Sequence, residues 1–139
     1  MKTLHGHFCH YYGNLGFIGK ISALLDKKIS KTRRAVSFGV LYHTVVAMPT
    51  SIEFVNMHKH IPCISKLSNG EQSHILVIED KIQAIKDYFF KSKSREKYED
   101  LLEKDNDNGI EKMSDEITDL WYDFQNKYNE LKKFISVYD

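Results

Sequence analysis

The chain has 139 residues, 42% of them hydrophobic, and a formal net charge of +1 at pH 7. This length favours one domain, and this apolar fraction suffices for a core that needs no disulfide bond. The longest apolar run is much shorter than the ~20 residues of a membrane-spanning helix, and the first residues lack the hydrophobic block of a signal peptide. The sequence therefore argues against a membrane protein and predicts a cytoplasmic protein whose two cysteines, Cys9 and Cys63, are reduced.

The charges are divided unevenly along the chain. Residues 1–66 contain nine Lys or Arg residues and two acidic residues, a net charge of +7, whereas residues 67–139 contain eleven basic and seventeen acidic residues, a net charge of −6. A basic segment attracts polyanions such as nucleic acids. Two alternatives stay open: the halves pack together and partly cancel, or the acidic excess only solvates long helices.

In chain order, the first part of the sequence favours strands. Residues 35–48 (AVSFGVLYHTVVAM) give the strongest strand signal, because they are rich in Val, Phe, Tyr and Thr. Glycines at 13, 16 and 19 indicate a turn, which is followed by a short helical pattern and by a polar, basic loop over residues 26–34. Shorter strands are expected over residues 3–12, 52–57, 60–65 and 74–78.

The pattern changes to helices after Glu79. Apolar residues then recur three and four positions apart, and a break at residues 105–109 offers several helix N-caps. A long amphipathic stripe follows over residues 110–135. The sequence thus predicts an α+β fold in a single domain, residues 1–139. A small antiparallel SH3-like barrel or sheet in the strand-rich, basic residues 1–78 would be packed by helices of the acidic residues 79–139.

Seven histidines are many for this length, and two groups of them look alike. They could together supply zinc ligands, since the two histidines of an H-x-H pair on a strand share a face. However, their spacing matches no standard zinc signature, so we expect neither a metal nor another cofactor. The groups are His5, His7 and His10, and His58, His60 and Cys63.

Residues 26–51 carry the parts that RNA cleavage by a 2′-hydroxyl needs: a base, a cation and groups that hold the phosphate. His43 is the candidate base and Arg33 or Arg34 the candidate cation, with Arg34 preferred, and Thr50 and Ser51 are hydroxyls at the end of a strand. Thr50 or Ser51 could equally cap the next element. The candidate RNA-binding residues, for phosphates and for base stacking, are Lys27, Lys28, Lys31, Arg33, Phe38 and Tyr42.

The order of a basic cluster (residues 33–36), an apolar segment (residues 38–41) and Ala-Met-Pro-Thr-Ser (residues 47–51) resembles the MazF/ToxN (AbiQ) toxin endoribonucleases. Three features depart from the family pattern: the position of Pro49, the alanine after Arg34, and the absence of a lysine after Ser51. The resemblance spans residues 20–125. It implies a metal-independent endoribonuclease toxin of a toxin–antitoxin or phage-defence system, which cleaves single-stranded RNA and is held in check by a cognate RNA or protein antitoxin.

The alternative is a non-catalytic phage or mobile-element protein that inhibits a host factor through its acidic helices. Long acidic helices can occupy a basic groove on another protein, and a zinc-supported structural domain is a third hypothesis. The sequence leaves open whether the chain forms a homo-oligomer. The acidic residues expected to contact the partner are Asp100, Glu103, Asp105, Asp107 and Glu111.

Overall fold

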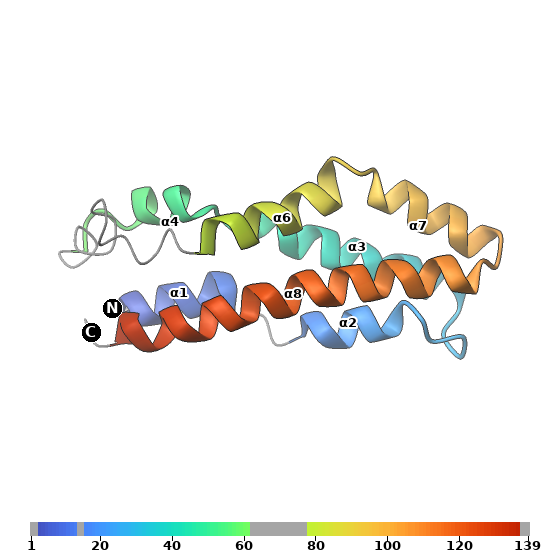
Figure 1. Ribbon diagram of the computed structural model, residues 1–139, viewed down its shortest axis with the longest axis horizontal. Coiled ribbons are helices and arrows are strands. Elements are labelled where there is room, and N and C mark those ends of the chain that lie inside the picture. The colour runs from blue at the N-terminus through green and yellow to red at the C-terminus, as the bar shows by residue number, and fades with distance from the viewer. Residues whose placement is uncertain (1–2, 14–15, 62–77, 137–139) are drawn as a thin grey trace. The chain divides into compact units, whose positions relative to one another are not determined.

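In the computed structural model, every regular element that can be described is a helix (Figure 1). The structure describes residues 3–13, 16–61 and 78–136, and these contain no β-strand. The helices are α1 (Leu4–Tyr12), α2 (Phe17–Ala23), α3 (Lys31–Ala47), α4 (Ser51–Met57), α6 (Glu79–Phe90), α7 (Ser94–Glu103) and α8 (Asp107–Ser136).

The predicted α+β fold with an SH3-like barrel is therefore wrong, and α3 shows the physical reason. A strand would place Val36, Phe38 and Val40 on one face, but Phe38 is buried whereas Val36 is 61% and Val40 40% exposed. The buried positions of α3 instead include Arg34, Phe38, Leu41 and Val45, which are three and four residues apart. Burial of this helical face outweighs the weak strand preference of the valines.

Two other predicted strands are also helical. Residues 3–12 lie almost entirely in α1, where the Thr3 hydroxyl accepts a hydrogen bond from the Gly6 amide (3.0 Å). Residues 52–57 lie in α4, which Thr50 caps in the same way. The strands expected over residues 60–65 and 74–78 fall mostly within residues 62–77, outside the described residues. The helices expected after Glu79 are confirmed.

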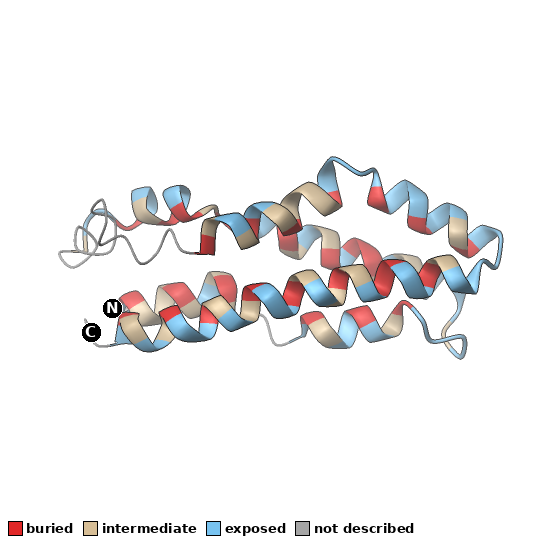
Figure 2. Ribbon diagram, viewed as in Figure 1, coloured by how far each residue is buried: buried red, intermediate tan, exposed pale blue. Residues whose placement is uncertain are grey.

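The chain divides into two compact units, each built from segments that are distant in sequence. Unit 1 comprises Met1–Asn14, Met48–Gln83 and Asp123–Asp139, and unit 2 comprises Leu15–Ala47 and Ala84–Tyr122. The units do not follow the predicted boundary between residues 78 and 79; the single domain stays a prediction. Buried positions recur at about one helical turn along α8 (Figure 2), as the apolar stripe over residues 110–135 predicted.

The core of unit 1 is aromatic. The ring of Phe8 stacks on Tyr128, with centroids 5.2 Å apart, and meets Phe54 edge to face at 5.7 Å. The buried hydroxyl of Tyr12 donates a hydrogen bond to the Pro49 carbonyl (2.8 Å). Burial, followed by the charge of Glu79, raises the pKa of Tyr12 well above its usual value. This core joins α1, α4 and the end of α8.

Unit 2 has a second aromatic core. The ring of Phe38 stacks on Tyr98 at 4.8 Å, and Phe17 stacks on Trp121 at 3.9 Å. The Tyr98 hydroxyl donates a hydrogen bond to the Leu24 carbonyl (3.0 Å). Burial raises the pKa of Tyr98 to about 12, against the opposing effect of the positive charge of Arg34. These contacts place Arg34 beside the core of unit 2.

Across the described ranges, no single helix is long and apolar enough to cross a membrane. Helices α3 and α4 reach this length and hydropathy only as a pair, with a break between them.

Candidate functional site

Arg34 is the one buried arginine among the described residues, with 7% of its surface exposed. The Ser30 hydroxyl accepts a hydrogen bond from the Arg33 amide (3.2 Å) at the start of α3, and the helical spacing then places Arg34 on the same face as Phe38. Its Nε is fully buried, and no described residue accepts a hydrogen bond from it. Nor does any described carboxylate lie within 4.0 Å of its guanidinium group. A buried charge in this state is unfavourable.

A cavity of about 260 Å³ adjoins this guanidinium group. Its walls come from the loop after α2, from the first turn of α3 and from the beginning of α8. Across the cavity wall, Lys27 and Asp107 form an ion pair of 2.5 Å between Nζ and Oδ2, so their charges largely cancel. The lining residues are Leu25, Lys27, Arg34, Asp107, Ile110 and Glu111.

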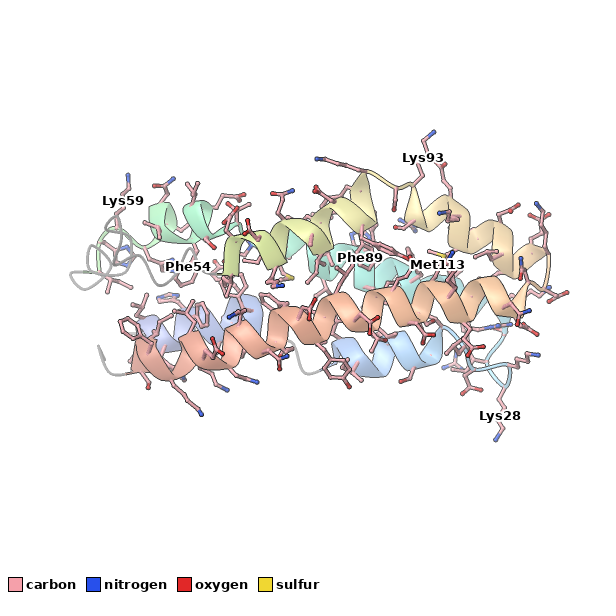
Figure 3. All side chains as sticks on the ribbon, viewed as in Figure 1. Lys28, Phe54, Lys59, Phe89, Lys93 and Met113 are labelled. Carbon is pink, nitrogen blue, oxygen red and sulfur yellow. The ribbon has the colours of Figure 1, made fainter. Side chains whose placement is uncertain are left out.

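A second ion pair joins the predicted RNA-binding loop to the loop between α7 and α8. The Lys31 ammonium lies 2.8 Å from an Asp105 carboxylate oxygen. The hydrogen bond from Lys31, followed by its charge, lowers the pKa of Asp105. Two of the lysines predicted to bind RNA, Lys27 and Lys31, are therefore already paired with carboxylates. Lys28 is exposed and projects away from the helices (Figure 3).

The Lys31–Asp105 pair predicts a pH-dependent contribution to stability. Because the pKa of Asp105 is lowered in the folded state, the pair stabilises the fold above the unfolded pKa, and this stabilisation is lost as the pH falls through the folded pKa. We expect the melting temperature of the wild type to exceed that of Asp105→Asn at pH 7, and the difference to shrink below pH 4. Glu96→Gln, at an exposed position without an ion pair to a described residue, is the control. A difference that is constant between pH 7 and pH 3 contradicts the prediction.

The predicted hydroxyl pair begins a helix and does not end a strand. The Thr50 hydroxyl accepts a hydrogen bond from the Glu53 amide (3.1 Å), so the alternative that Thr50 caps the next element is confirmed. Ser51 is 0% exposed, and its hydroxyl has no hydrogen-bond partner among the residues that the structure describes. The Ser51 amide donates to Oε2 of Glu79 (2.7 Å). The Thr50 hydroxyl and the Ser51 amide therefore both form hydrogen bonds within unit 1.

Glu79 places its carboxylate at the beginning of α4, although it lies 28 residues further along the chain. An anionic acceptor at a helix N-terminus stabilises the free amide groups there. We expect Glu79→Gln to lower the free energy of unfolding by about 1–2 kcal/mol, measured by urea denaturation at pH 7. Asp80→Asn, an exposed position in the same turn of α6, removes the same charge and is the control. Equal losses in the two variants would refute this role of Glu79.

The four predicted catalytic residues are not brought together within either unit. Thr50 and Ser51 belong to unit 1, whereas Arg34 and His43 belong to unit 2. Arg34 and His43 are both on α3, and nine residues of helix separate them by half a turn and by about 13 Å. They therefore face opposite sides of α3 and do not share one phosphate.

The predicted stacking residues are packed against other side chains. Phe38 is 1% exposed and stacked on Tyr98. Tyr42 is half-buried, with Phe90 against its edge at 5.2 Å and the guanidinium carbon of Arg95 5.9 Å from its ring centroid. Arg33 and His43 are exposed. A base could reach Phe38 only if the core of unit 2 opened, whereas Tyr42 keeps part of its surface exposed.

The two histidine groups meet at one point. The rings of His7 and His58 lie 4.5 Å apart, and Nδ1 of the buried His58 is 2.7 Å from the Phe54 carbonyl oxygen. The ring of His5 approaches the sulfur of Cys9, and Cys63 lies outside the described residues. Within the described part of the chain, no group of three or more His, Cys, Asp or Glu residues is arranged to hold a metal ion.

Arg34 was predicted from the sequence as a site residue, but the residues around it were not. A signal was present, because Arg34 precedes Phe38, Leu41 and Val45 in the i, i+4, i+7 pattern of a helix face. A helical interpretation of residues 35–48 would have placed Arg34 in the buried stripe. The contribution of Leu25, Ile110 and Glu111 depends on tertiary packing and has no local signal. No family model, no curated protein and no solved structure matches this chain.

Proposed function

We propose that this chain is a non-catalytic helical binding protein whose partner is a protein with a basic surface. The observation that carries the proposal is an acidic face on the part of α8 that belongs to unit 2. Glu111, Asp115 and Asp119 are exposed and recur every four residues, and none forms an ion pair with a described residue. Tyr122, 53% exposed, extends this face.

The spacing of these carboxylates favours recognition over simple solvation. Positions four apart lie about 6 Å from one another along a helix and nearly on one line. Like charges in this arrangement destabilise an isolated helix by about 0.2–0.5 kcal/mol per pair. Lys112 is the only basic residue between positions 107 and 122. A row of Lys or Arg side chains on a partner would relieve this repulsion and gain the aromatic ring of Tyr122.

The acidic residues named from the sequence fall into two classes. Three of these carboxylates already form ion pairs within the chain: Asp100 with Lys104 (3.1 Å), Asp105 with Lys31 and Asp107 with Lys27. Glu103 and Glu111 are exposed and form no ion pair with a described residue. We therefore place the proposed contact surface on the exposed face of α8, and not on the loop between α7 and α8 that the sequence predicted.

Affinity capture with a matched pair of variants tests the proposal. The first variant, Glu111→Gln with Asp115→Asn and Asp119→Asn, removes the charge of the α8 face. The second, Glu96→Gln with Asp100→Asn and Glu103→Gln, removes three charges from α7. We expect the wild type to capture a basic protein from a native extract with an affinity that falls at least tenfold in the α8 variant, less than threefold in the α7 variant, and steeply with salt.

Stability separates loss of the contact surface from loss of the fold. The α8 variant should unfold at the same or a slightly higher urea concentration than the wild type, because like-charge repulsion is removed. Two results would count against the proposal: equal weakening by both variants, or capture that is unaffected by either. A wild-type chain that retains no basic protein would also refute it.

The endoribonuclease toxin, its RNA substrate and its cognate antitoxin stay predictions. The direct assay incubates the purified chain with single-stranded RNA in EDTA and compares it with Thr50→Ala and His43→Ala. Cleavage by the wild type that both variants abolish would favour the ribonuclease hypothesis over the binding protein. RNA that stays intact with the wild-type chain would refute the ribonuclease hypothesis.

A further inference from the structure

We propose that the cavity beside Arg34 binds a small molecule through a carboxylate or phosphate group. The binding group would be the guanidinium of Arg34, which lines the cavity and whose buried Nε has no hydrogen-bond partner among the described residues. This site lies in unit 2 and shares only Glu111 with the acidic face of α8. Because the test below changes Arg34 and leaves the α8 carboxylates intact, either proposal can fail alone.

The first argument is the missing counter-charge. An arginine that is 7% exposed has lost most of its hydration, and buried arginines are normally paired with a carboxylate or hydrogen-bonded. Asp105 lies near enough for the charge of Arg34 to contribute to its lowered pKa, after the larger effect of Lys31. The carboxylates of Asp105 and Asp107 nevertheless form their ion pairs with Lys31 and Lys27. Arg34 is therefore left with a directional, planar set of donors, which matches an oxyanion in bidentate geometry.

The second argument is the shape and lining of the cavity. Its volume of about 260 Å³ lies just below the range of drug-sized ligand sites, so it suits a small molecule. Leu25 and Ile110 offer apolar walls for the carbon skeleton. Glu111 lines the same cavity and would accept a hydrogen bond from a ligand hydroxyl or ammonium group. A ligand with one anionic group and a hydrogen-bond donor complements all three features.

The structural alternative is that water alone hydrates the guanidinium group. Bridging waters satisfy many polar groups in cavities of this kind. The two alternatives differ in one measurable property, since hydration gives no saturable response to added anions whereas a binding site does.

Thermal unfolding with two probes distinguishes these alternatives. The melting temperature is followed in sodium acetate and in sodium phosphate, each from 0.1 to ~20 mM, with sodium chloride keeping the ionic strength constant. We expect a saturable rise of about 5 °C with at least one probe. A response to acetate identifies a carboxylate ligand, and a response to phosphate a phosphate ligand. Arg34→Met should abolish the rise, whereas Arg33→Met, the exposed neighbour with the same charge change, should keep it.

Several results would overturn the proposal. These are a wild type that responds to neither probe, a response that does not saturate, and equal responses in the wild type and in Arg34→Met. If Arg34→Met does not fold, Arg34→Lys keeps the charge without the planar fork and should weaken binding about tenfold. The NMR signal of the arginine Nε–H groups in the wild type gives a second measurement, in which one resonance should shift with the anion concentration.

Discussion

Replacing Phe8 by alanine is expected to lower the free energy of unfolding by about 3–5 kcal/mol. Phe8 is 0% exposed, and its ring contacts Tyr12, Phe54 and Tyr128, which come from three helices of unit 1. Truncation removes both the burial of the ring and the aromatic contacts, and it leaves a cavity that the neighbouring rings cannot fill. Urea denaturation followed by circular dichroism at 222 nm measures the loss.

Phe90→Ala is the control for this substitution. Phe90 ends α6 and is 38% exposed, so the same truncation should cost no more than about 1.5 kcal/mol. A similar loss at both positions would show that Phe8 is not in a packed core. The position of α1 against the end of α8 would then be wrong.

The second large effect has the opposite sign. Arg34→Met is expected to raise the free energy of unfolding by about 1–3 kcal/mol in buffer without small anions. Methionine keeps the length and apolar contacts of the side chain but removes a charge that is 7% exposed and has no ion-pair partner among the described residues. Such a gain would fit a binding role for Arg34, because a bound anion would supply the counter-charge that the free chain lacks.

Arg33→Met provides the comparison for Arg34→Met, because it makes the same change one position away on the exposed face of α3. Its effect should stay within about 0.5 kcal/mol. A loss of more than 1 kcal/mol in Arg34→Met would show that the guanidinium group stabilises the folded chain. The cavity beside it would then have no unmet charge to offer a ligand.

The second half of the chain was predictable because its pattern has one interpretation. The apolar residues between Ile110 and Ile135 recur at three and four positions, which fits a helix and excludes a strand. The helix N-cap predicted within residues 105–109 is also present. The Asn106 side chain accepts a hydrogen bond from the Gly109 amide (3.0 Å) at the start of α8.

The first half was ambiguous for a definable reason. Leu4, Phe8 and Tyr12 are four residues apart, and a spacing of four is both one helical turn and a multiple of the two-residue period of a strand. Local residue preferences then favoured the strand, whereas packing of the aromatic rings selects the helix. Contacts with residues far along the chain decide between them, among them Phe54 and Tyr128, which both pack on Phe8.

Individual residues of the candidate site could be predicted from the sequence, but their contacts with one another could not. Thr50 followed three positions later by Glu53 has the spacing of a helix N-cap, and this alternative was visible beside the catalytic one. The ion pairs of Lys27 and Lys31 join residues more than 70 positions apart. No local pattern shows that such lysines are already neutralised, so the basic loop looked more available to RNA than it is.

The composition of unit 1 has a consequence for synthesis of the chain on the ribosome. The Tyr128 hydroxyl donates to the Cys9 sulfur across 119 residues, so α1 is made long before the end of α8. At roughly 5–20 residues per second, the delay is about 6–24 s. Throughout that interval the apolar side of α1, with Leu4, Phe8 and Tyr12, lacks its aromatic partner on α8. Early binding of α1 by a chaperone, or by α4 alone, would protect the growing chain from aggregation.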